Sequence, residues 1–189
     1  MELFLSLWLP ILVCGVVLFF ASFVAWALSP HHKPDVRFLP DEDALFAVIK
    51  SQNLTPGQYM FPKCEHADMK NPEAVARYKA GPWGLLRVWP SAVTMPKNLA
   101  ATFTMFLIVS AVIGYLASVA FPRGAAFGDV FAFTAIAGVM AHTAGGILGE
   151  IWFTKPLRAK VMDFIDGVVY GLLTGLIFAL LWPGLPAVA

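Results

Sequence analysis

The chain has little charge, little cysteine and none of the motifs of the common enzyme classes. Only 13% of its 189 residues are charged. The formal net charge of +1 excludes the basic excess that is typical of nucleic-acid-binding proteins. It has no nucleotide-binding loop, nucleophile elbow, HExxH zinc motif, CxxCH haem motif or kinase signature. We therefore expect a protein that does not bind nucleic acid and that is not an enzyme of these classes.

The two cysteines provide no disulfide framework. Cys14 lies in an apolar run, whereas Cys64 lies in a polar stretch. Two thiols in such different surroundings do not predict a disulfide-stabilised secreted domain. A reducing compartment is the expected setting for Cys64.

Apolar residues are abundant, at 59% of the chain, and they are concentrated in four long runs. A membrane-spanning helix needs about 20 such residues, and no strand-like alternation indicates a barrel. We expect the first run to be a retained span rather than a cleaved signal peptide, because it is too long and follows the acidic Glu2. We expect an all-α membrane protein with four transmembrane helices and a small α+β cytoplasmic insertion between helices 1 and 2. The runs are 3–28, 99–121, 130–153 and 164–182.

The basic residues predict the orientation of the chain in the membrane. Nine of the thirteen Lys and Arg lie between the first two spans, three lie between the last two, and only Arg123 lies on the other side. Because basic loops stay in the cytoplasm, we expect both termini on the outer side of the membrane. The expected domains are transmembrane helix 1 (1–29), a cytoplasmic loop domain (30–98) and a three-helix transmembrane bundle (99–189).

The loop domain has signals for a helix and a strand pair. Asp41 is a suitable N-cap for a helix that extends to about Gln52. Two short extended pieces, 59–61 and 85–89, are each stopped by proline and are predicted to pair. Such a ribbon is marginally stable alone, so it needs the helix or the membrane surface for support.

Small residues at four-residue spacing let membrane helices approach closely, and spans two to four have them. We expect these three spans to form a tight bundle. Span one, which is rich in aromatic residues, is expected to face lipid or partner subunits. The predicted helix-packing residues are Gly114, Gly145, Gly149, Gly167, Gly171 and Gly175.

His142 is the histidine of the spans, and Glu150 follows it by about two helical turns, so both project from a similar face. Polar groups at this depth are costly and usually face the bundle interior. One reading is a proton relay or cation site. The other is structural: His142 bonds a neighbouring hydroxyl and Glu150 pairs with Lys155 or Arg158. No second histidine lies at matching depth for a bis-His haem, so we expect no cofactor.

Four further residues, His31, His32, Cys64 and His66, have side chains that bind zinc. Their spacing does not match a standard chelating motif, and His31 and His32 also suit the membrane interface. At the start of span four, Asp163 and Asp166 are expected to be stabilised by the helix dipole. Asp166 is also expected to bond Arg158 or Lys160.

Several phrases together resemble a family of small four-span bacterial inner-membrane proteins, itself uncharacterised in activity. The likeness covers most of the chain and implies location and architecture, but it transfers no functional residues. The phrases are 30–33 (PHHK), 39–42 (LPDE), 56–62 (PGQYMFP), 81–86 (GPWGLL), 88–90 (VWP), 151–152 (IW) and 166–183, which runs from DG to LWP.

From these features we expect a non-enzymatic accessory or scaffold subunit of a larger bacterial energy-converting membrane complex. Its partners would be the lipid bilayer and other membrane subunits, contacted through helix 1. One alternative is a homo-oligomeric channel or proton-linked transporter that uses His142 and Glu150. A third is a membrane metal-binding protein or enzyme.

Overall fold

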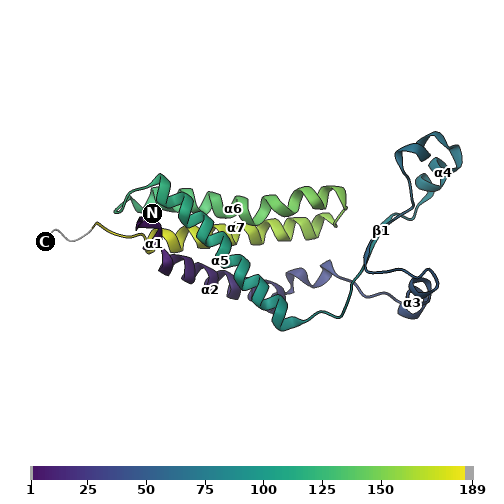
Figure 1. Cartoon of the computed structure of the whole chain (residues 1–189), viewed down its shortest axis with the longest axis horizontal. Helices are drawn as coiled ribbons and strands as arrows, with labels where there is room; N and C mark the ends of the chain where they lie inside the picture. Colours follow the sequence, from purple (N-terminus) through teal and green to yellow (C-terminus); the bar gives the residue numbers. More distant parts are fainter. Residues whose placement is uncertain (1, 186–189) are drawn as a thin grey trace. The chain divides into compact units, whose positions relative to one another are not determined.

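The computed structural model describes residues 2–185 and is mostly helical, with one small sheet of two strands (Figure 1). It divides into two compact units. The bundle comprises Met1–Arg37 and Thr94–Ala189, and the insertion comprises Phe38–Val93. The last four residues of the predicted three-helix bundle, 186–189, lie outside the described residues.

The bundle consists of a helical part near the N-terminus and three long helices that follow the insertion. Its first part contains α1 (Glu2–Leu5), α2 (Trp8–Phe23), the π-helical turn η1 (Val24–Leu28) and the 3₁₀ helix η2 (Pro30–Asp35). Its second part contains α5 (Met95–Ala120), α6 (Phe127–Trp152) and α7 (Leu157–Leu180).

Four helical stretches of the bundle are long and apolar enough to cross a membrane. They are Trp8–Leu28, Met95–Ala120, Phe127–Trp152 and Leu157–Leu180, of 21 to 26 residues each. About 20 helical residues cross the 30 Å hydrocarbon core. The four helices therefore indicate a multi-pass membrane protein, in agreement with the four predicted apolar runs.

Helices α6 and α7 lie side by side with their backbones in contact (Figure 1). A Cβ added to Gly171 would lie 2.4 Å from the backbone nitrogen of Val139, and one added to Gly138 would lie 2.8 Å from the Cα of Gly171. Added Cβ atoms at Gly167 and Gly175 would also overlap α6. Only glycine permits the two backbones to come this close. Such close packing holds membrane helices together, because lipid provides no hydrophobic driving force between them.

Gly145 and Gly149 do not take part in this packing. A Cβ at either position would meet no atom within 4 Å in the described part of the chain. The face of α6 that contacts α7 passes through Phe131, Ala135 and Gly138. Gly145 and Gly149 belong to a different series of small residues at four-residue spacing, which lies on another side of α6. Spacing in one sequence does not distinguish the series that contacts α7 from the other.

Helix α2 belongs to the bundle, where it packs against α5 and α7. Cys14 and Leu18 are fully buried, and Gly15 lies directly against the side chain of Leu107. Gly114 of α5 faces the ring of Phe178. Spans two to four therefore do not pack as a separate group, because α2 completes the core. The first spanning stretch, Trp8–Leu28, carries exposed aromatic side chains: Trp8, Phe20, Phe23 and Trp26.

The insertion is a small α+β unit, as the sequence predicted. It contains α3 (Glu42–Ser51), β1 (Gly57–Phe61), the 3₁₀ helix η3 (His66–Lys70), α4 (Pro72–Ala80) and β2 (Gly84–Val88). Asp41 caps α3 by accepting a hydrogen bond from the Ala44 amide at 3.1 Å. Strands β1 and β2 pair antiparallel, with Tyr59 opposite Leu86. This pairing confirms the two predicted extended pieces.

Candidate metal centre and polar cavity

Two adjacent histidines meet one carboxylate at the junction of η2 and α7. Pro30 begins η2, and Ser29 caps it by accepting a hydrogen bond from the amide of His31. The Nε2 atom of His31 lies 3.1 Å from Oδ1 of Asp166, and Nε2 of His32 lies 2.9 Å from Oδ2. One ligand atom from each of the three side chains lies within 4.8 Å of the other two. His32 and Asp166 are buried.

The other nitrogen of each imidazole ring is also held. Nδ1 of His32 lies 2.7 Å from a carboxylate oxygen of Asp35, and Nδ1 of His31 lies 2.5 Å from the hydroxyl of Ser29. Arg158 donates to the other oxygen of Asp35 at 2.5 Å and to the backbone carbonyl of His31 at 2.6 Å. Each imidazole ring is therefore held at its Nδ1 atom, while its Nε2 atom points to the carboxylate of Asp166.

In the absence of a metal, the cluster stabilises a charged His32. Both ring nitrogens of His32 face carboxylate oxygens, which only accept hydrogen bonds, so both carry a proton. The indole of Trp26 stacks on the ring, with centroids 3.8 Å apart and planes at 7°. The charges of His32 and Arg158 balance those of Asp35 and Asp166.

The pKa values outside the spans agree with this arrangement. Burial alone lowers the pKa of His32, but the hydrogen bonds to Asp166 and Asp35 and the charges of both carboxylates outweigh burial and raise that pKa above its ordinary value. The hydrogen bond from His32, aided by the charge of Arg158, holds the pKa of Asp35 below its ordinary value against the opposing effect of burial.

Two imidazole nitrogens and a carboxylate are a ligand set that Zn²⁺ and related divalent transition metals bind. A metal would displace the Nε2 protons, while each Nδ1–H continues to donate to Asp35 or to the Ser29 hydroxyl. Metal-binding histidines typically have such a partner on the second nitrogen, because it fixes the tautomer and the ring orientation. Three protein ligands leave a fourth position for water or a substrate.

Of the four side chains predicted to bind zinc, only His31 and His32 belong to this cluster. Cys64 and His66 are part of the insertion, where Cys64 donates a hydrogen bond to the sulfur of Met69 at 3.5 Å. The third ligand, Asp166, was predicted to bond Arg158 or Lys160. It bonds both histidines instead, and Arg158 bonds Asp35. The sequence did contain a signal for this third ligand. Asp166 is the tenth residue of α7, too far from its first turn for the helix dipole alone to explain an acidic side chain there.

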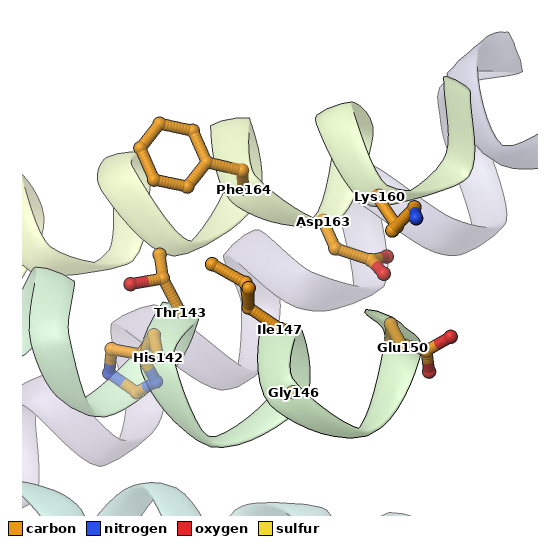
Figure 2. Close-up of a pocket in the computed structure, with 8 residues that line it drawn as sticks. All are labelled: His142, Thr143, Gly146, Ile147, Glu150, Lys160, Asp163 and Phe164. Atoms are coloured by element: carbon orange, nitrogen blue, oxygen red, sulfur yellow. The ribbon is translucent and has the colours of Figure 1, made fainter. Parts of the chain in front are cut away.

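A separate cavity of about 210 Å³ lies between α6 and α7 (Figure 2). His142 lies at one end of the cavity, and Glu150 and Lys160 lie at the other (Figure 2). Thr143, Gly146 and Ile147 of α6 and Asp163 and Phe164 of α7 complete the lining. The two residues that the sequence places on one face of span three, His142 and Glu150, thus border the same space.

The structural interpretation of His142 and Glu150 is not supported by the contacts. The Nε2 atom of His142 is buried and has no hydrogen-bond partner among residues 2–185. The ring instead contacts two aromatic rings, those of Tyr170 at 5.7 Å and Phe106 at 5.8 Å between centroids. Neither predicted partner reaches Glu150, because Lys155 pairs with Asp163 and Arg158 pairs with Asp35.

Tyr170 lies between the two sites. Its hydroxyl donates to Asp166 at 3.5 Å, and its ring makes a T-shaped contact with His142. The histidine–aspartate cluster and the cavity are therefore neighbours within one bundle.

The fold and the cluster together define a class: a multi-pass helical membrane protein with a buried His–His–Asp centre beside one end of a spanning helix. A scan against protein-family models and searches of curated proteins and of solved structures found no match to the chain. Any function must therefore be inferred from the geometry of the chain's own residues.

Proposed function

We propose that this chain is a metal-binding protein of the bacterial inner membrane, with His31, His32 and Asp166 as ligands of a divalent transition-metal ion. Zn²⁺ fits best, because it accepts two imidazoles and a carboxylate while keeping a fourth position open. The observation that carries this proposal is the convergence of two Nε2 atoms on one carboxylate, with ligand atoms within 4.8 Å.

The carboxylate of Asp35 and the hydroxyl of Ser29 distinguish this cluster from a simple ion pair. An ion pair between a histidine and Asp166 needs only one ring nitrogen. Here the remaining nitrogen of each ring has its own acceptor, at 2.7 Å for His32 and 2.5 Å for His31. This arrangement orients both Nε2 lone pairs toward one point when the protons leave.

The location rests on the distribution of charge and on the family resemblance. Twelve of the thirteen basic residues lie in the two segments on the same side of the four spans, which favours a cytoplasmic insertion and periplasmic termini. The metal would then bind at the cytoplasmic end of the bundle. A phosphatase fused after the last residue should be active in the periplasm, and an inactive fusion would reverse the orientation.

Zinc binding tests the proposal directly. The full chain in lipid nanodiscs should bind one Zn²⁺ per chain, measured by elemental analysis after dialysis. The Asp166→Asn variant should lose it. A matched control, the double variant Cys64→Ser with His66→Gln, should keep full occupancy. Zinc that is absent from the wild type, or equal in Asp166→Asn, would contradict the proposal.

The second candidate is the accessory or scaffold role in a larger membrane complex. The observation that favours it is the first spanning stretch, Trp8–Leu28, where Trp8, Phe20, Phe23 and Trp26 are 47–64% exposed. Bulky aromatic side chains supply large contact areas to a neighbouring helix. Purification from native membranes tests this role: copurifying subunits support it, and a lone monomer contradicts it.

A further inference from the structure

The cavity between α6 and α7 is large enough to hold water, and ionisable side chains border it, while most of its remaining lining is apolar. Its volume of about 210 Å³ is enough for several water molecules, each of which occupies about 30 Å³ in the liquid. Empty cavities in proteins are usually apolar, whereas cavities with polar partners hold water. This cavity is lined by one histidine, two acids and one lysine: His142, Glu150, Asp163 and Lys160.

The cavity also borders groups whose hydrogen bonds are unmet. His142 lines the cavity with its ring while its unpartnered Nε2 atom is buried, and Glu150 and Lys160 make no ion pair among residues 2–185. A buried unpaired polar group costs roughly 1–3 kcal/mol unless water satisfies it. Water in the cavity would satisfy Glu150 and Lys160 at its outer end and would reach the ring of His142 at its inner end (Figure 2).

The depth of His142 makes such access notable. It lies ten residues from Trp152, the last residue of α6, or about 15 Å along the helix, which is half the hydrocarbon thickness. An ionisable residue at this depth normally faces an aqueous path or a partner. Two aromatic rings contact the ring of His142, and of these Tyr170 of α7 is ionisable whereas Phe106 of α5 is not.

We infer that the cavity is a water-filled path through which a proton reaches His142 from the aqueous phase beside Glu150. The step is a simple proton exchange: cavity water donates a proton to the imidazole ring and later takes it back. Glu150 and Lys160 at the mouth hold the water and set the local charge. The cavity lining does not include His31, His32 or Asp166, so the path can be tested without a metal bound to them.

Paired cysteine variants test the path at two depths. In a Cys64→Ser background, His142→Cys and Gly146→Cys point into the cavity region, and their matched controls, Met140→Cys and Leu148→Cys, lie two residues away. Met140 and Leu148 are 63% and 70% exposed on the surface of the spanning helix, where lipid surrounds them. Gly146 has open space for a side chain. Cys14 is fully buried and serves as the internal background.

The probe is a charged, membrane-impermeant maleimide added to the nanodisc-embedded protein. Because the thiolate is the reactive form, labelling requires both water and loss of a proton. We expect each cavity thiol to react at least tenfold faster than its control at the same depth. Equal or slower labelling at Gly146→Cys would overturn the water path. An unreactive His142→Cys in a protein that elutes normally in size exclusion would overturn proton access to His142. If that variant does not fold, the Gly146 pair decides.

Discussion

The bundle contains two histidine sites that differ in every contact. His32 is bonded at both ring nitrogens, to Asp35 and Asp166, and it stacks on an indole. His142 lies against aromatic rings with an unpaired Nε2 and a cavity at its side. Hydrogen bonds fix the orientation of the histidine ring at the first site, whereas a cavity lies beside the histidine ring at the second. The difference favours two kinds of chemistry: fixed ligands for a metal at the first site, and proton exchange through the proposed cavity water at the second.

Asp166 accounts for much of this difference. Its carboxylate lies within hydrogen-bond distance of the Nε2 atoms of His31 and His32, and it also accepts a hydrogen bond from the hydroxyl of Tyr170, whose ring contacts His142.

Changes at Asp166, Asp35 and His32 alter the first site, whereas a change at Gly171 alters both. The predictions below run from the largest expected effect to the smallest.

Replacing Asp166 should have the largest effect. Asp166→Asn removes a metal ligand and leaves the charge of His32 partly unpaired in a buried place, so we expect at least a 100-fold loss of zinc affinity and a loss of about 3 kcal/mol in unfolding free energy without metal. Isothermal titration and denaturant unfolding measure these values. Asp163→Asn is the control, since its half-exposed pair with Lys155 should contribute less than about 1 kcal/mol. Equal effects of the two variants would contradict the account.

Gly171→Ala should disturb both sites by moving α7. The new Cβ would lie 2.4 Å from the backbone nitrogen of Val139, so the two helices must separate. We expect a loss of about 2 kcal/mol, in the range of overpacked cores, measured by unfolding in detergent. Gly145→Ala, which meets no atom within 4 Å in the described chain, should leave the unfolding free energy unchanged. A tolerated Gly171→Ala would show that α6 and α7 are not in backbone contact.

Asp35→Asn separates orientation from ligation. Asp35 does not reach the centre, but its carboxylate holds Nδ1 of His32 at 2.7 Å. Partners of metal-bound histidines typically contribute 10–100-fold to metal affinity. We expect a loss in that range with the stoichiometry still at one zinc per chain. Unchanged affinity would show that Asp35 does not orient His32.

The pH dependence of stability should be the smallest effect. The raised pKa of His32 means that its charged interactions contribute fully below about 6.5, its ordinary pKa, and are lost as the pH rises through the folded value. The lowered pKa of Asp35 has the opposite sign, so its contribution is lost as the pH falls below about 4. The metal-free protein should melt at a lower temperature at pH 9 than at pH 6.

A His32→Gln variant is the matched control for this measurement. It cannot carry the charge, so the difference in melting temperature between the two pH values should shrink. If wild type and variant respond to pH alike, groups other than His32 set the dependence.

The sequence predicted the architecture more completely than the sites. Each apolar run determines its own helix. Within the insertion, Asp41 marks the start of α3 and prolines mark the ends of the strands, so these elements can be predicted without knowledge of distant contacts. The pairing of His31 and His32 with Asp166 joins residues more than 130 positions apart and depends on the rotation of α7 about its axis. The same rotation decides that Gly138, rather than Gly145, contacts α7. Periodicity alone leaves that rotation open.

X-ray absorption at the zinc edge of the loaded protein in nanodiscs tests the central claim most directly. We expect two imidazole nitrogens and oxygen donors at about 2.0–2.2 Å, with the imidazole signal reduced in Asp166→Asn together with the bound zinc. A sulfur ligand at about 2.3 Å would assign the metal to a cysteine instead, and the absence of bound zinc would contradict the metal centre itself.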